Sequence, residues 1–170
     1  MKYDDASWHS GGEFPDASPA ELGGTHIALF LKWCFQKGWA GELHIEHEPE
    51  AVRSVVDGSM AATEFLFEYC DGKLTNDSLN HEGNTFSEYY YGDNGDYLED
   101  YAAFFGDHLY VEAEAAHDFA VYAEMVEVRY QEWLAELAEE ACSTTDPHNG
   151  TDTDSQPETN VRRKPWWRLW

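Results

Sequence analysis

Residues 116–141 read AHDFAVYAEMVEVRYQEWLAELAEEA, and this stretch decides the expected fold. Its large apolar side chains recur every three or four residues, which is the spacing of a helix that places one face in a core. The stripe comprises Phe119, Tyr122, Val126, Tyr130, Trp133 and Leu137. The spacing predicts a helix from about Ala116 to Ala141, and we expect it to be the longest element and the spine of the protein.

Shorter helical patterns precede this stretch. Residues 18–21 (SPAE) combine an N-cap serine, a proline at the first helical position and a capping-box glutamate, so they predict the start of a helix. Apolar spacing predicts further short helices over residues 50–56 and 60–69. Two more are expected after the capping-box sequences that begin at Thr85 and Asp96.

Residues 41–48 alternate apolar and polar side chains, which leaves a short strand and an extended connector open. Strand patterns are otherwise too few for a sizeable sheet. We therefore expect a mainly α fold: a single-domain helical bundle with possible short strands, a long C-terminal helix and a flexible tail.

Composition divides the chain into three parts. Residues 1–142 are predicted to form an acidic globular helical domain, and residues 143–165, rich in Ser, Thr, Asp and Pro, a flexible linker. The terminal peptide, residues 166–170, carries Trp166, Trp167 and Trp170. With the arginines beside it, this peptide can insert at a membrane interface, dock in a groove or fold back on the acidic body, and an adaptor function using it is a third hypothesis.

The formal net charge is -24, with 34 Asp and Glu against 10 Lys and Arg. Such a surface repels nucleic acid and anionic lipid and attracts cationic proteins, so we expect a basic protein partner, no nucleic acid and no stable membrane insertion. Adaptation to salt and simple solubility are alternative explanations of the charge. With no signal peptide or long apolar window visible, we expect a cytoplasmic protein whose three cysteines are reduced core thiols.

The common motifs for phosphate binding, serine hydrolysis, zinc proteolysis and dinucleotide binding are absent from the sequence, so we expect no enzyme, no metal and no cofactor. The alternative is a metal-dependent or acid/base enzyme that uses Asp4, Asp5, His9 and His26, or the His and Glu cluster of residues 44–50. A structural interpretation of the opening residues is an arm held on the helices by Trp8 and Phe14.

An aromatic and acidic run is the expected partner-binding surface, because tyrosine rings and carboxylates bind Arg and Lys well. It comprises Tyr89, Tyr90, Tyr91, Asp93, Asp96, Tyr97, Glu99 and Asp100. The alternative is that the tyrosines line the core. In both cases we expect the carboxylates to be exposed.

The opening residues 2–9 (KYDDASWH), followed by Gly11-Gly12, Phe14-Pro15 and residues 25–27 (THI), resemble a family of small uncharacterised bacterial proteins over residues 2 to about 140. The motif residues are Tyr3, Asp4, Asp5, Trp8, His9, Gly12, Phe14, Pro15 and His26. Members of that family look like immunity proteins of polymorphic toxin systems. The resemblance implies an immunity protein that binds a basic cognate toxin and occludes its active site with an acidic surface.

Overall fold

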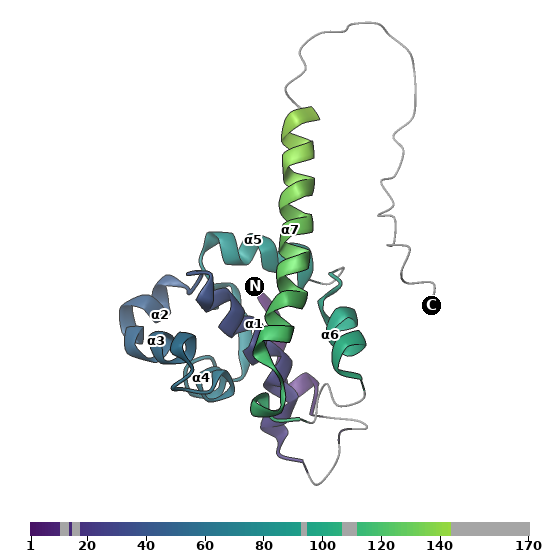
Figure 1. Ribbon diagram of the computed structural model, residues 1–170. Coiled ribbons are helices and arrows are strands. Elements are labelled where there is room, and N and C mark those ends of the chain that lie inside the picture. The colour runs from purple at the N-terminus through teal and green to yellow at the C-terminus, as the bar shows by residue number, and fades with distance from the viewer. Residues whose placement is uncertain (11–13, 15–17, 93–94, 107–111, 144–170) are drawn as a thin grey trace, which may run out of the picture.

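Seven α-helices and two short strands make up most of the computed structural model, which describes residues 1–10, 14, 18–92, 95–106 and 112–143 (Figure 1). The helices are α1 (Thr25–Gln36), α2 (Glu42–His47), α3 (Pro49–Asp57), α4 (Ala62–Tyr69), α5 (His81–Tyr90), α6 (Tyr97–Phe105) and α7 (Phe119–Ser143). The strands are β1 (Lys2–Asp5) and β2 (Lys73–Thr75). Short 3-10 helices are η1 (Ala6–Trp8), η2 (Ala20–Gly24), η3 (Asn76–Ser78) and η5 (Glu114–Ala116). The mainly α prediction with short strands is confirmed.

Several predicted features fall outside the described residues. They are Gly12, Pro15, Asp93, nearly all of the proposed linker of residues 143–165, and the terminal peptide with Trp166, Trp167 and Trp170. The proposals about the tail therefore stay predictions.

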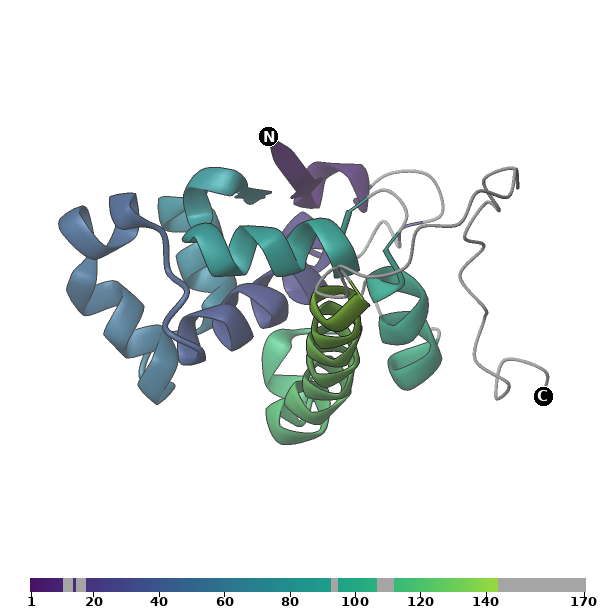
Figure 2. The same ribbon diagram turned by 90° about the horizontal axis from the view of Figure 1, so that it is seen from above.

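Helix α1 is the centre of the fold. Ten of its twelve residues are buried, from Thr25 to Phe35 with the single exception of Lys32. A helix that is apolar on nearly all sides is stable only when other elements surround it. In Figures 1 and 2, α2, α3 and α4 lie on one side of α1 and α6 on the other, while α7 crosses between them. The prediction that α7 is the spine is therefore wrong, because α1 holds that position.

Helix α7 is the longest element, as predicted, but only its first half is covered. Tyr122, Met125 and Val126 are buried, whereas nearly every side chain from Gln131 onward is exposed, including Leu137. Figure 1 shows this second half extending beyond the other helices. The helical period of the sequence continues past the end of the body, so the predicted core stripe ends at Trp133.

Residues 42–47 form a helix, so the prediction of a strand or an extended connector is wrong. The alternating Leu43 and Ile45 are about half exposed, and the polar His44 between them is the buried side chain. Helix α3 begins at once with Pro49 at its first position, where the missing N–H costs nothing, and ends at Gly58 with φ +83°. The sheet instead joins β1 to β2, antiparallel, with an irregularity between Lys2 and Asp4.

A buried ion pair ties α6 to α7. Arg129 donates from Nε and Nη2 to the two oxygens of Asp100 at 2.7 and 2.9 Å, and Tyr90 donates its hydroxyl to Asp100 at 3.1 Å. The expectation that the carboxylates are exposed is therefore wrong for Asp100, whose burial is repaid by a bidentate cation.

Replacing Asp100 by alanine should lower the free energy of unfolding by about 3 kcal/mol, because the buried Arg129 then loses its bidentate partner and keeps only Glu132 at 2.9 Å and Asp96 at 3.9 Å. The double variant Asp100→Leu with Arg129→Met should lose clearly less, since no buried charge remains. Urea unfolding followed by circular dichroism measures both. Equal losses in the two variants would contradict this account of the pair.

Candidate functional site

The side chains of His9, His26 and Tyr91 converge on the carboxylate of Asp4. We call these four residues the Asp4 cluster. His9 Nε2 lies 2.7 Å from Asp4 Oδ1, and His26 Nε2 lies 3.0 Å from Asp4 Oδ2. Tyr91 donates its hydroxyl to Oδ2 at 2.6 Å. The two imidazole rings meet edge to face with centroids 4.4 Å apart. Asp4 and His26 are buried, and His9 is the partly exposed member, with 14% of its side chain accessible.

Local sequence explains how the cluster forms. After β1, the side chain of Asp5 caps η1 by accepting from the Ser7 N–H at 3.0 Å. His9 follows at the end of this turn, which brings its ring back to Asp4. Asp5 also pairs with Lys2 at 2.8 Å, so it does not join the cluster, contrary to its place in the predicted catalytic set. The sequence identified Asp4, His9 and His26 as candidates, but Tyr91 was assigned to a partner surface.

The sequence suggested an amino-terminal arm held on the helices by Trp8 and Phe14, and the structure differs at Trp8. Trp8 is 59% exposed, with Lys2 Nζ 4.2 Å from the centre of its ring, so it does not hold the arm on the helices. Tyr3 is half-buried and donates its hydroxyl to Asn84 Oδ1 at 3.1 Å, and Phe14 is half-buried. The arm is therefore held by the pairing of β1 with β2 and by polar contacts of Tyr3 and Asp4.

Opposing effects set the charge states in the cluster. Burial by itself raises the pKa of Asp4, but the hydrogen bonds from His26, His9 and Tyr91 outweigh it and hold that pKa well below its usual 3.8. Burial lowers the pKa of His26 below 6.5 and outweighs the opposing influence of Asp4. A carboxylate can only accept hydrogen bonds, so the contact with ionised Asp4 requires a proton on Nε2 of His26.

These two shifts predict acid sensitivity with a defined sign. Because the folded-state pKa of His26 is lowered, the unfolded chain takes up a proton first as the pH falls below 6.5, and stability decreases by up to about 1.4 kcal/mol per pH unit. Asp4 adds to the loss below about pH 3.8. The free energy of unfolding of chelator-treated protein is measured by urea unfolding between pH 6.5 and 5. In this range it should depend less on pH in His26→Gln than in the wild type. The control His47→Gln, at an exposed position, should keep the wild-type dependence on pH. The same dependence in His26→Gln would refute this account.

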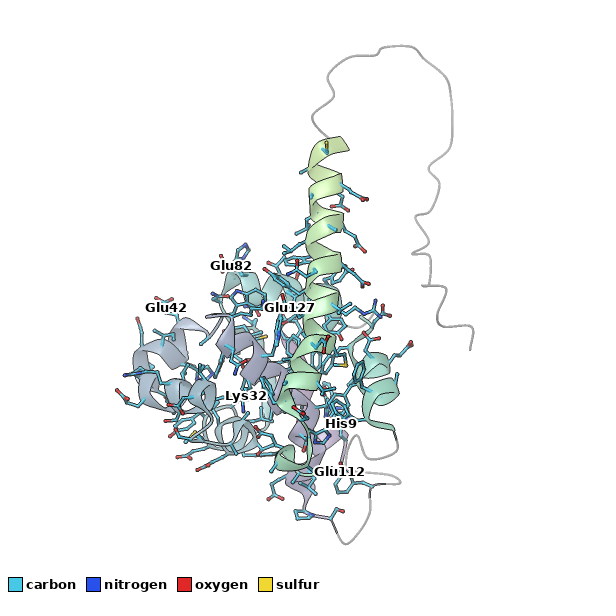
Figure 3. The ribbon with its side chains drawn as sticks, in the orientation of Figure 1. His9, Lys32, Glu42, Glu82, Glu112 and Glu127 are labelled. Atoms are coloured by element: carbon cyan, nitrogen blue, oxygen red, sulfur yellow. The ribbon has the colours of Figure 1, made fainter. Side chains whose placement is uncertain are left out.

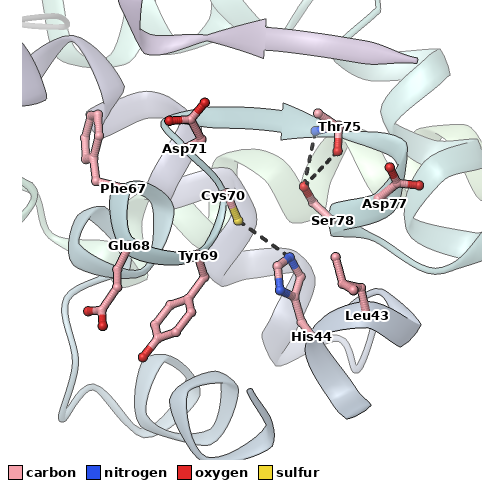
Figure 4. A pocket seen from close by; sticks show the side chains of 10 residues that line it. All are labelled: Leu43, His44, Phe67, Glu68, Tyr69, Cys70, Asp71, Thr75, Asp77 and Ser78. Carbon is pink, nitrogen blue, oxygen red and sulfur yellow. Dashed lines mark hydrogen bonds between the residues drawn. The ribbon is translucent and has the colours of Figure 1, made fainter. Parts of the chain in front are cut away.

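A second polar group lies in a pocket beside α4, shown in Figure 4. His44 Nε2 lies 3.5 Å from Cys70 Sγ, and its Nδ1 lies 3.3 Å from Glu48 Oε2. Cysteine, histidine and carboxylate in this order are the arrangement of a nucleophile, its base and an orienting group. However, burial raises the pKa of the Cys70 thiol to about 12, so the nucleophilic thiolate is scarce at neutral pH. The sequence did not predict this contact, because a short strand or an extended connector was expected at residues 41–48, whereas the helix α2 carries His44.

Alkylation distinguishes the three cysteines. Cys34 is buried, Cys70 is partly buried and Cys142 is exposed, so the prediction of three core thiols is wrong for Cys142. With iodoacetamide at neutral pH, Cys142 should react readily in the native protein. Cys34 and Cys70 should react on the order of a hundredfold more slowly than in urea, because the fold shields both side chains and burial raises the pKa of both thiols. Fast labelling of Cys70, read by peptide mass spectrometry, would instead assign it as an activated nucleophile.

The predicted partner surface is mostly core. Tyr90, Tyr91 and Tyr97 are buried, and Tyr97 donates its hydroxyl to the backbone oxygen of His26 at 2.6 Å. The alternative, in which tyrosines line the core, is confirmed for these three. Tyr89 is half-buried and Asp96 is half-exposed, whereas Glu99 is exposed. Partner binding by these last three side chains stays a prediction.

Every Lys and Arg side chain among the described residues is paired with a carboxylate. Lys2, Lys32, Lys37, Arg53, Lys73 and Arg129 each form an ion pair with a carboxylate, and these six are the Lys and Arg of residues 1–145. Many further carboxylates point outward, including Glu42 and Glu82 in Figure 3. The described surface is therefore strongly negative.

An apolar groove lies between α6 and α7 within this negative surface. Its volume is about 440 Å³, and it is lined by Asp100, Ala103, Phe104, Glu124, Met125, Val128, Arg129 and Glu132. Phe104 and Val128 are each more than half exposed, and Glu124 and Glu132 are exposed beside them. The groove thus combines apolar area with carboxylates.

Comparison with known protein families matches residues 2–117 to a family described as a domain of unknown function (DUF7832). The chain belongs to this family. The DUF7832 match contains the whole Asp4 cluster and α6, and it ends just before α7 begins. Searches of curated proteins and of solved structures find no match. Among the helices that the structure describes in this DUF7832 protein, none has the length and hydrophobicity needed to cross a membrane.

Proposed function

We propose that this protein is an immunity protein that binds a basic protein toxin and occludes its active site. The observation that carries the proposal is the pairing of all six Lys and Arg of the body with carboxylates. A surface whose cations are already paired favours a cationic partner and repels phosphate and anionic lipid. The resemblance of the opening motif to immunity proteins supports the finer identification of the partner as a toxin.

The α6–α7 groove is the part of this surface that we assign to the partner. Charge alone speeds association but gives little net affinity, and affinity comes from buried apolar and aromatic contacts. Phe104 and Val128 supply apolar area, and Glu124 supplies a carboxylate for Arg or Lys beside Glu132, which pairs with Arg129 at 2.9 Å. Glu99, one helical turn before Ala103 on α6, extends the acidic rim. A basic side chain with an aliphatic stem matches both properties of the groove.

Toxins that act on nucleic acids or nucleotides need cationic clefts for phosphate groups. An acidic rim that approaches such a cleft competes with the substrate for the same Arg and Lys side chains. Inhibition then requires no chemistry by the immunity protein, because a bound partner of this size excludes the substrate.

The surface is tested by two variants that change the net charge equally. Glu99→Lys, Glu124→Lys and Glu139→Lys together alter the groove and the exposed part of α7, and they spare the Arg129 ion pairs. Glu42→Lys, Glu64→Lys and Glu68→Lys together alter exposed carboxylates on α2 and α4, on the other side of α1. Wild type and both variants are used as baits in host lysate at low and moderate salt, and bound proteins are quantified by mass spectrometry.

We expect one stoichiometric basic protein on the wild type and on the α2–α4 variant at low salt. Its association rate with the groove variant should fall about tenfold or more, and binding should weaken for all baits as salt rises. Equal binding to the groove variant would remove the groove from the interface. No partner on any bait at low salt would overturn the binding proposal.

The immunity role is tested separately with the identified partner. Expressed alone in a bacterial host it should arrest growth, and co-expression of this protein should restore growth. Co-expression of the groove variant should restore it less well. A partner that does not impair growth would end the immunity assignment and leave only a protein–protein interaction.

A further inference from the structure

We propose that Asp4, His9 and His26 form a binding site for one divalent transition-metal ion of the zinc type. Among the described residues, this is the one group of His, Cys, Asp and Glu side chains in which three ligand atoms lie within 4.8 Å of one another. The proposal does not depend on the toxin partner. It uses residues that the partner surface does not touch.

The distances fit a shared cation. Zinc bonds to imidazole nitrogen and carboxylate oxygen are about 2.0–2.2 Å long, which places neighbouring ligand atoms of a tetrahedron about 3.3 Å apart. In the cluster, the two Nε2 atoms lie 2.7 and 3.0 Å from oxygens of Asp4. All three ligand atoms lie within 4.8 Å of one another, so small movements of the three side chains would bring them to the tetrahedral spacing, with a cation in place of the two Nε2 protons.

The surroundings of Asp4 match those of a metal-binding carboxylate. Oδ1 accepts the backbone N–H of Asp5 at 2.7 Å, and Oδ2 accepts the hydroxyl of Tyr91 at 2.6 Å. Each oxygen thus has one donor from the protein and one contact with a histidine nitrogen. Outer hydrogen bonds of this kind orient metal ligands, and their loss typically weakens binding 10- to 100-fold.

The donor set determines the class of metal. Two imidazoles and one carboxylate suit zinc and the neighbouring first-row ions, including iron, cobalt and nickel, whereas calcium and magnesium prefer all-oxygen sites. With three protein ligands, a fourth coordination position remains for water. Because His9 is the only cluster member with appreciable exposure, we place that position on its side of the cluster.

A purely structural cluster is the competing explanation, and variants of His9 separate the two. The amide of His9→Gln can still donate a hydrogen bond to Asp4 but is a poor zinc ligand, whereas His9→Ala loses both functions. If the cluster serves only to hold the arm, glutamine should preserve all its properties. If it binds metal, glutamine should preserve folding and lose metal affinity.

The experiment uses the full chain, stripped with a chelator and titrated with zinc against a colorimetric zinc indicator, with millimolar magnesium present to occupy exposed carboxylates. Cobalt absorption spectra provide a second readout of imidazole coordination. The control replaces His47 and His81, both exposed and outside the cluster, by glutamine. Circular dichroism of each stripped variant verifies folding.

We expect one zinc ion per chain, a higher melting temperature with zinc, and visible cobalt bands. His9→Gln should bind zinc at least about a hundredfold more weakly, and Tyr91→Phe about 10- to 100-fold more weakly. The control variant should bind like the wild type. Affinity unchanged in His9→Gln and Asp4→Asn, or no zinc bound by the stripped wild type, would overturn the proposal.

Discussion

The buried carboxylate of Asp4 is the constraint on which the rest of the structure depends. A carboxylate removed from water is strongly destabilising unless donors surround it. Here the donors come from the turn after β1, the start of α1 and the end of α5, so these three segments must be in place together. The network continues beyond them. The ring of Tyr91 stacks on Tyr97 with centroids 4.3 Å apart, and the Tyr97 hydroxyl contacts both the His26 backbone oxygen and the Tyr122 hydroxyl on α7.

The polar side chains of this protein therefore fall into a buried group and a surface group. Those inside, such as Asp4 and the Asp100–Arg129 pair, form hydrogen bonds and ion pairs between separate elements, and they fix how those elements pack. Those outside are mostly carboxylates, and the lysines and arginines of the body are paired with some of them. The partner proposal relies on the outer group and the metal proposal on the inner one.

Helical periodicity was a good guide where tertiary packing agreed with it. It located α3, α4 and α7, and the Asp96 capping box marked the start of α6. It was wrong where a polar side chain took an inward position. His44 is buried against Phe35 and Phe65 while Leu43 and Ile45 are exposed, so an alternating pattern in residues 41–48 described a helix. Helix α5 begins at His81, one turn before the expected Thr85, because Asn80 caps it by accepting from the Gly83 N–H.

The sequence by itself determined the helical class, the negative surface and the residue types able to carry chemistry, because composition and local spacing depend only on the order of the residues. Only the tertiary structure decided which of them meet. Asp4 and Tyr91 are 87 positions apart, and Asp4 and His26 are 22 apart, yet each pair is in hydrogen-bond contact. Asp4 and Asp5 are adjacent, yet one lies in the cluster and the other caps a turn. Such assignments depend on how strands and helices pack on α1, and packing between distant segments leaves no periodic signal in a single sequence.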